Sequence, residues 1–100
     1  MTAEAEKYRE QLRAILPELR ERFGVESLGL FGSRVRGDHR PDSDLDVLVR
    51  FLPGRTPGFF SYIDLEDALT ERLGLKVDLV PWASLRPYVE REVSREVQHI

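Results

Sequence analysis

Apolar and polar residues follow two different periods along this chain, and the change from one to the other marks its elements. Over residues 4–23, apolar side chains recur three and four positions apart, which places them on one face of an α-helix. That face consists of Tyr8, Leu12, Ile15, Leu16, Leu19 and Phe23. Pro17 predicts either a kink or the start of a second helix after Leu16, and Gly24 suits a C-terminal cap.

Short apolar runs then predict two strands. Residues 25–31 form a run typical of a buried strand that ends at Gly32, and residues 45–51 alternate between apolar and polar as in a second strand. Connecting segments are predicted at three places: a helical turn over residues 33–37 capped by Ser33, a loop over 38–43, and a Pro- and Gly-rich loop over 53–58. A strand, a tight turn and a second strand therefore occupy the middle of the chain.

The C-terminal part predicts a helix, a strand and a final helix. Residues 59–73 form the first of these helices, which Gly74 ends. Its inner side is expected to hold Phe60, Ile63, Ala68, Leu69 and Leu73. Residues 75–80 alternate as a third strand, stopped by Pro81, and a last helix follows over residues 84–98. That helix carries an apolar stripe, which we interpret as packing on the chain's own sheet rather than as a partner surface: Leu85, Val89, Val93 and Val97.

Length and composition place the chain among ordinary globular domains. Its 100 residues, 41% hydrophobic and 33% charged, predict a single domain over residues 1–100 with a two-layer core. The order of the predicted elements indicates an α/β (α+β) fold, a small mixed β-sheet with helices packed on it. The chain contains no cysteine, which excludes disulfides, thiolate catalysis and cysteine-bound zinc.

Charge and hydropathy limit the cellular compartments and the binding partners expected for this chain. The first residues carry acids and lack an apolar core, so we expect no signal peptide. No window approaches the roughly 18 apolar residues of a membrane span, so we expect a cytoplasmic protein without membrane contact. The net charge of −3 argues against direct nucleic-acid binding. Residues 32–55 nevertheless hold five arginines and four aspartates, a local charge of +1 that suits an anionic ligand.

The most informative feature is a spacing. Gly32 and Ser33 are followed by ten residues and then by Asp44 and Asp46. Gly32 lacks a Cβ, so a phosphate can approach the backbone closely, and the hydroxyl of Ser33 can donate to a phosphate oxygen. The spacing thus combines a turn suited to phosphate with a pair of carboxylates, as a nucleoside triphosphate with magnesium requires.

The two carboxylates gain a third by strand alternation. Asp44 and Asp46 are two positions apart and are expected on one face of the second strand. If the third strand pairs beside the second, Asp78 joins them. Hard oxygen ligands of this kind suit Mg²⁺, and two such ions organise an in-line displacement at phosphorus. Asp78 is also placed to take up the proton of an attacking hydroxyl, either directly or through the metal.

Arginines follow the Gly-Ser turn. Arg34 and Arg36 lie one and three residues after Ser33, and arginine can clamp a phosphate with two hydrogen bonds. Phosphate contact and a solvated surface charge are equally weighted for Arg36, and surface charge is favoured for Arg34. A calcium loop starting at Asp42 is excluded because its sixth and twelfth positions are Val47 and Pro53. The Gly-Lys signature of a P-loop is absent.

These motifs resemble those of the polymerase-β-type nucleotidyltransferases, and most closely the minimal nucleotidyltransferase (MNT) domains. The resemblance covers roughly residues 25–82 and rests on the runs Phe31–Gly37, Asp42–Val49 and Val77–Val80. It implies the palm-like core of that superfamily, catalytic metal ligation by Asp44, Asp46 and Asp78, and triphosphate contact by Gly32 and Ser33.

The resemblance also implies a partner. MNT domains are commonly paired with a HEPN-domain RNase toxin and act as its antitoxin, in some systems by adenylylating a tyrosine of the HEPN chain. We therefore predict transfer of a nucleoside monophosphate, with AMP from ATP as the first candidate, to a hydroxyl. Two alternatives stay open: a non-catalytic partner that neutralises the toxin by binding, and nucleotidyl transfer to a small molecule such as an aminoglycoside.

Overall fold

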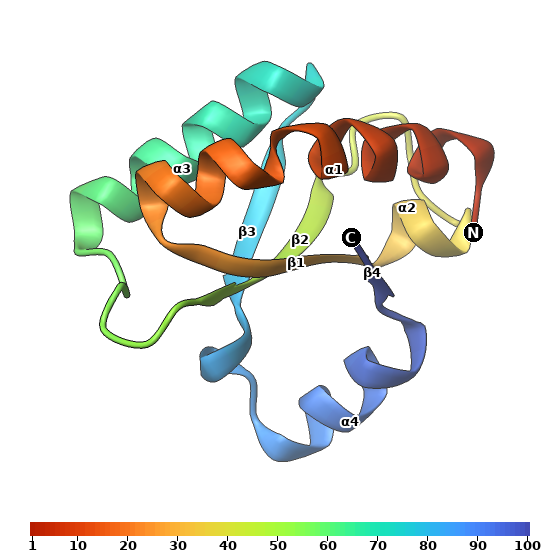
Figure 1. Cartoon of the computed structure of the whole chain (residues 1–100). Helices are drawn as coiled ribbons and strands as arrows, with labels where there is room; N and C mark the ends of the chain where they lie inside the picture. The colour runs from red at the N-terminus through yellow and green to blue at the C-terminus, as the bar shows by residue number, and fades with distance from the viewer.

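The computed structural model describes all residues 1–100 as a four-stranded sheet with helices on both faces (Figure 1). The elements are α1 (Ala3–Phe23), β1 (Val25–Phe31), α2 (Ser33–Arg36), β2 (Leu45–Phe51), α3 (Phe59–Leu73), β3 (Val77–Pro81), the 3-10 turn η1 (Trp82–Ser84), α4 (Pro87–Glu96) and β4 (Gln98–His99). The strand order is β3-β2-β1-β4. β1 is antiparallel to β2 and β4, whereas β2 and β3 are parallel, so the sheet is mixed as predicted.

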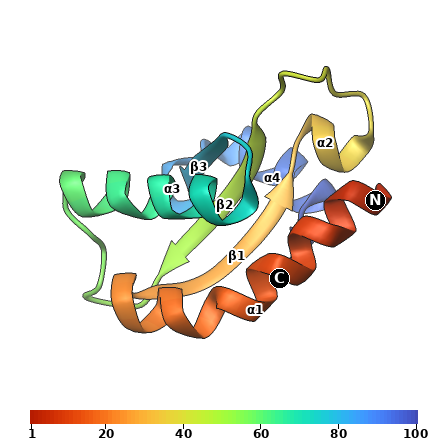
Figure 2. The same cartoon turned by 90° about the horizontal axis from the view of Figure 1, so that it is seen from above.

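Helices α1 and α3 lie side by side on one face of the sheet and enclose the main core (Figure 2). Leu12 and Leu19 of α1 and Leu65 and Leu69 of α3 are almost fully buried there. The sheet contributes the alternate residues of its three main strands to the same cluster: Leu28, Leu30, Leu45, Val47, Val49, Val77 and Leu79. Alternation then directs the intervening side chains of β2 and β3, including the aspartates, to the opposite face.

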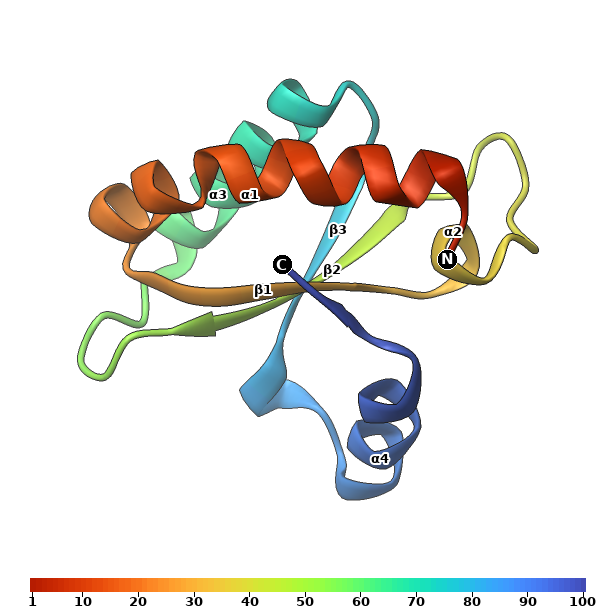
Figure 3. The same ribbon diagram turned by 45° about the vertical axis from the view of Figure 1, so that its right-hand side comes forward.

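On the side of the sheet away from α1 and α3 lies α4, which the chain reaches from β3 and leaves to form the edge strand β4 (Figure 3). Leu48 and Val93 are buried but lie outside the main core cluster. A Cβ on Gly29 would lie 2.6 Å from Val97 Cγ2, so this glycine lets the end of α4 approach β1 closely. Of the predicted apolar stripe, Val97 contacts β1 at Gly29 and Val93 is buried, whereas Leu85 precedes α4 and Val89 is half-buried.

The strands over residues 25–31 and 45–51 and the helix over 59–73 are confirmed at both ends. Gly24 and Gly74 cap their helices in the left-handed conformation, also as predicted. Of the two outcomes predicted for Pro17, a second helix after Leu16 is wrong, because α1 is a single helix that continues through the proline. Pro17 and Arg13 are both exposed, so water reaches the carbonyl that the proline leaves unpaired.

Other boundaries differ from the predictions. Ser33 is the first residue of α2 and Gly32 is its N-cap, so the predicted Ser33 cap is wrong. The third strand begins at Val77 rather than at residue 75 and includes Pro81. The last helix starts at Pro87, because η1 occupies residues 82–84, and ends at Glu96, after which the chain pairs with β1 as β4. This fourth strand was not predicted.

The inner face of α3 was also misjudged in part. Phe60 and Ile63 are 79% and 36% exposed, whereas Leu65 is fully buried. The buried line consists of Leu65, Leu69 and Leu73, four positions apart. Ile63 lies two positions before Leu65, which is about 200° around the helix and therefore on its outer side. Leu69 and Leu73 are buried as predicted. None of the helices combines the length and the apolar character needed to span a bilayer.

Candidate active site

The parallel pairing of β2 and β3 brings two of the predicted carboxylates together. The register aligns Asp46 with Asp78, between the buried pairs Leu45–Val77 and Val47–Leu79. Because their neighbours face the core, both aspartates point to the face opposite α1 and α3. Asp46 is half-buried and Asp78 is exposed. The predicted meeting of Asp78 with the Asp-x-Asp motif is thus a consequence of strand pairing.

Asp44 stands just before β2, where the loop over residues 38–43 delivers it to the sheet. The Leu45 amide donates to the Lys76 carbonyl at 2.9 Å, which anchors this end of β2 beside β3. The Lys76 ammonium lies 4.0 Å from Asp44 Oδ2, and the lysine is largely exposed. No group of three or more acidic, histidine or cysteine side chains is arranged to hold a metal ion. The predicted group of three carboxylates is therefore not formed: Asp46 and Asp78 are a hydrogen-bonded pair, and Asp44 reaches them only through its charge.

Crowding of these carboxylates perturbs the middle one. The pKa of Asp46 is raised from 3.8 to about 6, first by burial and then by the charges of Asp78 and Asp44 and a hydrogen bond with Asp78. The positive charge of Arg36 acts in the opposite direction. A half-buried carboxylate beside two others is an unfavourable arrangement for the protein alone and a suitable donor set for a hard divalent cation. The type of donor therefore fits Mg²⁺, although the three carboxylates do not form one closed group in this structure.

The raised pKa of Asp46 predicts that this carboxylate, when ionised, lowers the free energy of unfolding of the metal-free protein. Folding favours the protonated form of Asp46, because its folded pKa lies above 3.8. The contribution of Asp46 to the free energy of unfolding is fully present below pH 3.8 and is lost as the pH rises through about 6. A rise from 3.8 to about 6 corresponds to at most about 3 kcal/mol, which solvent screening at this half-exposed group reduces to about 1 kcal/mol.

We therefore expect Asp46→Asn to stabilise the metal-free protein at neutral pH. At pH values above 7 and in the presence of EDTA, the Tm of this variant should exceed that of wild type by about 4–8 °C. The difference should vanish near pH 4. Thermal unfolding followed by circular dichroism across this pH range measures both. Equal Tm values at every pH would contradict the strained carboxylate.

The Gly-Ser turn adjoins the carboxylate pair directly. Gly32 has φ +87°, and a Cβ built on it would lie 2.0 Å from Asp46 Oδ2. Only glycine combines this backbone conformation with such close contact. Ser33 follows as the first residue of α2 and is half-buried. The two halves of the predicted motif, ten residues apart in the chain, are thus adjacent in space.

Glu96, a residue that the sequence did not single out, forms hydrogen bonds with two of the groups predicted to bind phosphate. Glu96, the last residue of α4, accepts a hydrogen bond from the Gly32 amide at 2.8 Å. It also accepts from Arg36 Nη1, at 3.0 Å through Oε1 and 3.1 Å through Oε2. These hydrogen bonds are the first cause of a raised pKa at Arg36. Nothing in the sequence pattern relates Glu96 to residues about 60 positions earlier, because only the return of α4 and β4 brings it there.

Gly32, Arg36 and Glu96 line a hollow of about 230 Å³ between α2 and α4. A larger and mostly apolar cavity, about 540 Å³, lies toward the other end of β2 beside Trp82. That larger cavity contains none of the predicted site residues. The chemistry-bearing groups therefore gather at the Gly32 end of the sheet.

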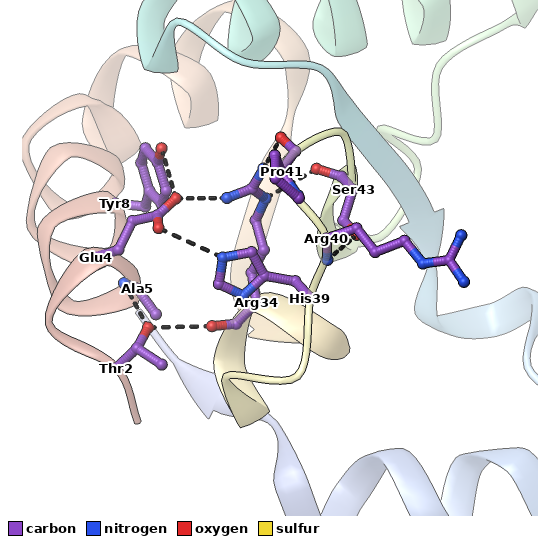
Figure 4. A network of polar contacts seen from close by, with 9 residues as sticks. All are labelled: Thr2, Glu4, Ala5, Tyr8, Arg34, His39, Arg40, Pro41 and Ser43. Carbon is purple, nitrogen blue, oxygen red and sulfur yellow. Dashed lines mark hydrogen bonds and ion pairs between the residues drawn. The ribbon is translucent and has the colours of Figure 1, made fainter.

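Arg34 is neither a phosphate contact nor a surface charge, the two roles considered for it from the sequence. Sequence analysis favoured a surface charge over a phosphate contact, but its side chain is buried and turned toward α1 (Figure 4). It pairs with Glu4 and with carbonyls of the loop before Asp44. No local pattern signals this role, because Glu4 lies 30 residues earlier in the chain and only the packing of α1 brings it to Arg34.

Comparison with known proteins agrees with this arrangement. The family model described as "Nucleotidyltransferase domain" matches residues 12–100. The protein adenylyltransferase MntA of Thermococcus cleftensis is 45% identical over 95 residues, covering 91% of this chain and 94% of that protein.

Two solved structures show the same fold. A protein described as a minimal nucleotidyltransferase superposes with a TM-score of 0.74 at 40% identity, covering 93% of this chain and 92% of its own. The MNT antitoxin complex with a tri-AMPylated Shewanella oneidensis HEPN toxin superposes with a TM-score of 0.64 at 22% identity, covering 92% and 70%. The chain therefore belongs to the nucleotidyltransferase domain family and is a nucleotidyltransferase of the minimal type.

Proposed function

We propose that this enzyme transfers AMP from ATP to a hydroxyl, a tyrosine of a HEPN-type RNase toxin, and thereby acts as an antitoxin that depends on Mg²⁺. The observation that carries the proposal is the contact between the Gly32 turn and the Asp46–Asp78 pair. The turn proposed to bind phosphate thus adjoins the carboxylates proposed to bind metal, which supports the proposal.

The residues divide the reaction between them. The Gly32 amide, the Ser33 hydroxyl and the Arg36 guanidinium would hold the phosphates that leave, and Asp44, Asp46 and Asp78 would hold two Mg²⁺ ions. Bound Mg²⁺ would neutralise phosphate charge and acidify the attacking hydroxyl. The acceptor oxygen forms a bond to the α-phosphorus, and the bond from that phosphorus to the bridging oxygen breaks, releasing pyrophosphate. Asp78 is placed to receive the proton of the acceptor.

The direction of the site follows from exposure. Asp78 is exposed, so the acceptor would arrive from solvent on the β3 side, while the phosphates would lie at Gly32 and the exposed Arg36. An acceptor carried by another protein suits this geometry. The name of the Thermococcus cleftensis relative supports adenylyl transfer to protein, and the AMPylated HEPN toxin of the Shewanella complex supports the kind of partner.

The test is to mix the purified chain, ATP and Mg²⁺ with a candidate HEPN-type protein and to follow the intact mass of that protein. We expect a mass increase of one AMP group per transfer, located on a tyrosine by fragmentation, and no increase with EDTA. Parallel reactions with GTP, CTP and UTP test the nucleotide. Modification of an aminoglycoside instead of the protein would favour the small-molecule alternative.

A further prediction concerns Glu96, because a phosphate at Gly32 and Arg36 must displace its carboxylate. Glu96→Gln is expected to lower the KM for ATP about two- to fivefold with little change in kcat, since an exposed ion pair competes only modestly. Initial rates at varied ATP and saturating Mg²⁺ measure this.

The matched control is Glu90→Gln, which removes the same charge from the same helix without touching Gly32 or Arg36. Its KM should equal that of wild type. A large fall in kcat for Glu96→Gln would show that Glu96 takes part in the chemistry rather than competing with the nucleotide.

A further inference from the structure

We infer that Arg34 is a positioning residue for the metal site: it holds the loop that delivers Asp44, and it is no ligand of the nucleotide. The inference rests on the proposed function insofar as Asp44 is taken to bind Mg²⁺. It is drawn from a polar network that joins the start of α1, α2 and the loop over residues 38–43 (Figure 4).

The guanidinium of Arg34 donates all of its observed hydrogen bonds to acceptors within the protein. The residue is only 8% exposed. Nε donates to the Ser43 carbonyl at 2.8 Å, Nη2 to the Pro41 carbonyl at 3.2 Å, and Nη1 to Glu4 Oε1 at 2.6 Å. All three nitrogens are therefore engaged, two of them with the backbone of one loop. A phosphate would have to break a part-buried ion pair and two backbone contacts to reach this side chain.

The loop that Arg34 holds leads directly to Asp44. Ser43 is the residue before Asp44, and its carbonyl is the closer of the two backbone acceptors of Arg34. The turn is closed from within, because the Ser43 hydroxyl accepts from the Arg40 amide at 2.9 Å and the Ser43 amide donates to the Arg40 carbonyl at 3.0 Å. Fixing the Ser43 carbonyl fixes the peptide plane that starts the Asp44 backbone.

The first turn of α1 supplies the counter-charge. Glu4 Oε1 also accepts from the Tyr8 hydroxyl at 3.1 Å, and Glu4 Oε2 lies 3.7 Å from His39 Nε2. The Thr2 hydroxyl donates to the Arg34 carbonyl at 3.0 Å. A buried cation is tolerated only when its charge and its donors are satisfied, and here α1 and the loop satisfy them together. The network thereby couples the N-terminal helix to the position of Asp44.

Arginine rather than lysine is required by this geometry. The fork of the guanidinium reaches three acceptors in different directions, whereas an ammonium offers one centre. Arg34→Lys keeps the charge facing Glu4 and loses the two carbonyl contacts. It therefore separates the charge of Arg34 from its hold on the loop.

We expect Arg34→Lys to raise the Mg²⁺ concentration for half-maximal rate about tenfold, as losses of supporting contacts at metal sites do. The KM for ATP at saturating Mg²⁺ should stay unchanged. Mn²⁺ affinity measured by electron paramagnetic resonance should fall by a similar factor. Amide hydrogen exchange should rise over residues 38–44 and stay unchanged in β1 and β2. The control is Arg72→Lys, which weakens an exposed arginine–glutamate pair at 2.6 Å between α3 and α1 and should change none of these quantities.

Two results would overturn the inference: faster exchange of the loop with unchanged Mn²⁺ affinity, or a raised KM for ATP with unchanged metal dependence. Should Arg34→Lys fail to fold, Glu4→Gln carries the same expectations, since it removes the counter-charge and leaves Arg34 in place. Asp44→Asn tests the proposed function separately from the role of Arg34. If it leaves Mn²⁺ affinity intact, the assignment of Asp44 to the metal fails, whereas loop exchange in Arg34→Lys still reports whether Arg34 holds the loop.

Discussion

AMP transfer is expected to stop when Asp44 or Asp46 is replaced by asparagine. Each change removes a carboxylate charge that a hard cation requires and keeps the shape of the side chain. Loss of metal-borne stabilisation of several kcal/mol corresponds to a fall in kcat of about 10³-fold or more. Single-turnover transfer to the acceptor protein, followed by mass spectrometry, measures it.

Asp42→Asn is the matched control. Asp42 lies in the same acidic run but is exposed in the loop, two residues before Asp44. Its variant should transfer AMP at the wild-type rate. Asp46→Asn should also be at least as stable as wild type, so loss of transfer in that variant cannot be attributed to unfolding. An active Asp46→Asn enzyme would contradict the assignment of the carboxylate pair.

The same variants decide between catalysis and binding as the basis of neutralisation. If the Asp44→Asn and Asp46→Asn chains still bind the toxin but no longer suppress its RNase activity, the chemistry is responsible. If suppression survives intact, the non-catalytic alternative is correct and transfer is incidental. The RNase activity of the toxin, measured with equal amounts of each variant, separates the two.

Gly32→Ala is expected to abolish transfer and to destabilise the fold. A methyl group at this position would meet Asp46 Oδ2 at 2.0 Å and Cγ at 2.9 Å, and the backbone has φ +87°. The unfavourable backbone conformation alone costs about 1–3 kcal/mol, and the clash pushes Asp46 away from Asp78. Urea unfolding and transfer at a temperature where the variant is folded measure the two effects.

Gly54→Ala separates the two causes. Gly54 also has a positive φ, +74°, but a Cβ there meets nothing within 4 Å. It should lose about 1 kcal/mol of stability and keep its transfer activity. Equal activities of the Gly32→Ala and Gly54→Ala variants would show that close contact between the Gly32 turn and Asp46 is not needed.

Local patterns predicted the elements whose boundaries carry local signals. Gly24 and Gly74 stop their helices because a left-handed residue ends the hydrogen-bond ladder. β1 and β2 were predicted at both ends, since apolar runs and turn residues delimit them. Errors occurred where tertiary contacts decide: the exposed Phe60 of α3 and the C-terminal residues that leave α4 to pair with β1.

The sequence by itself determined which chemical groups the candidate site contains. Gly32 and Ser33, spaced from Asp44 and Asp46, predict a phosphate-binding turn and hard oxygen ligands, because these properties belong to the residues and to strand alternation. Only the tertiary structure decided which side chains complete or compete for that site. Parallel pairing aligned Asp78 with Asp46, the return of α4 set Glu96 against Gly32 and Arg36, and burial against α1 turned Arg34 from the nucleotide to the loop. Each of these contacts joins residues far apart in the chain, and no local period encodes them.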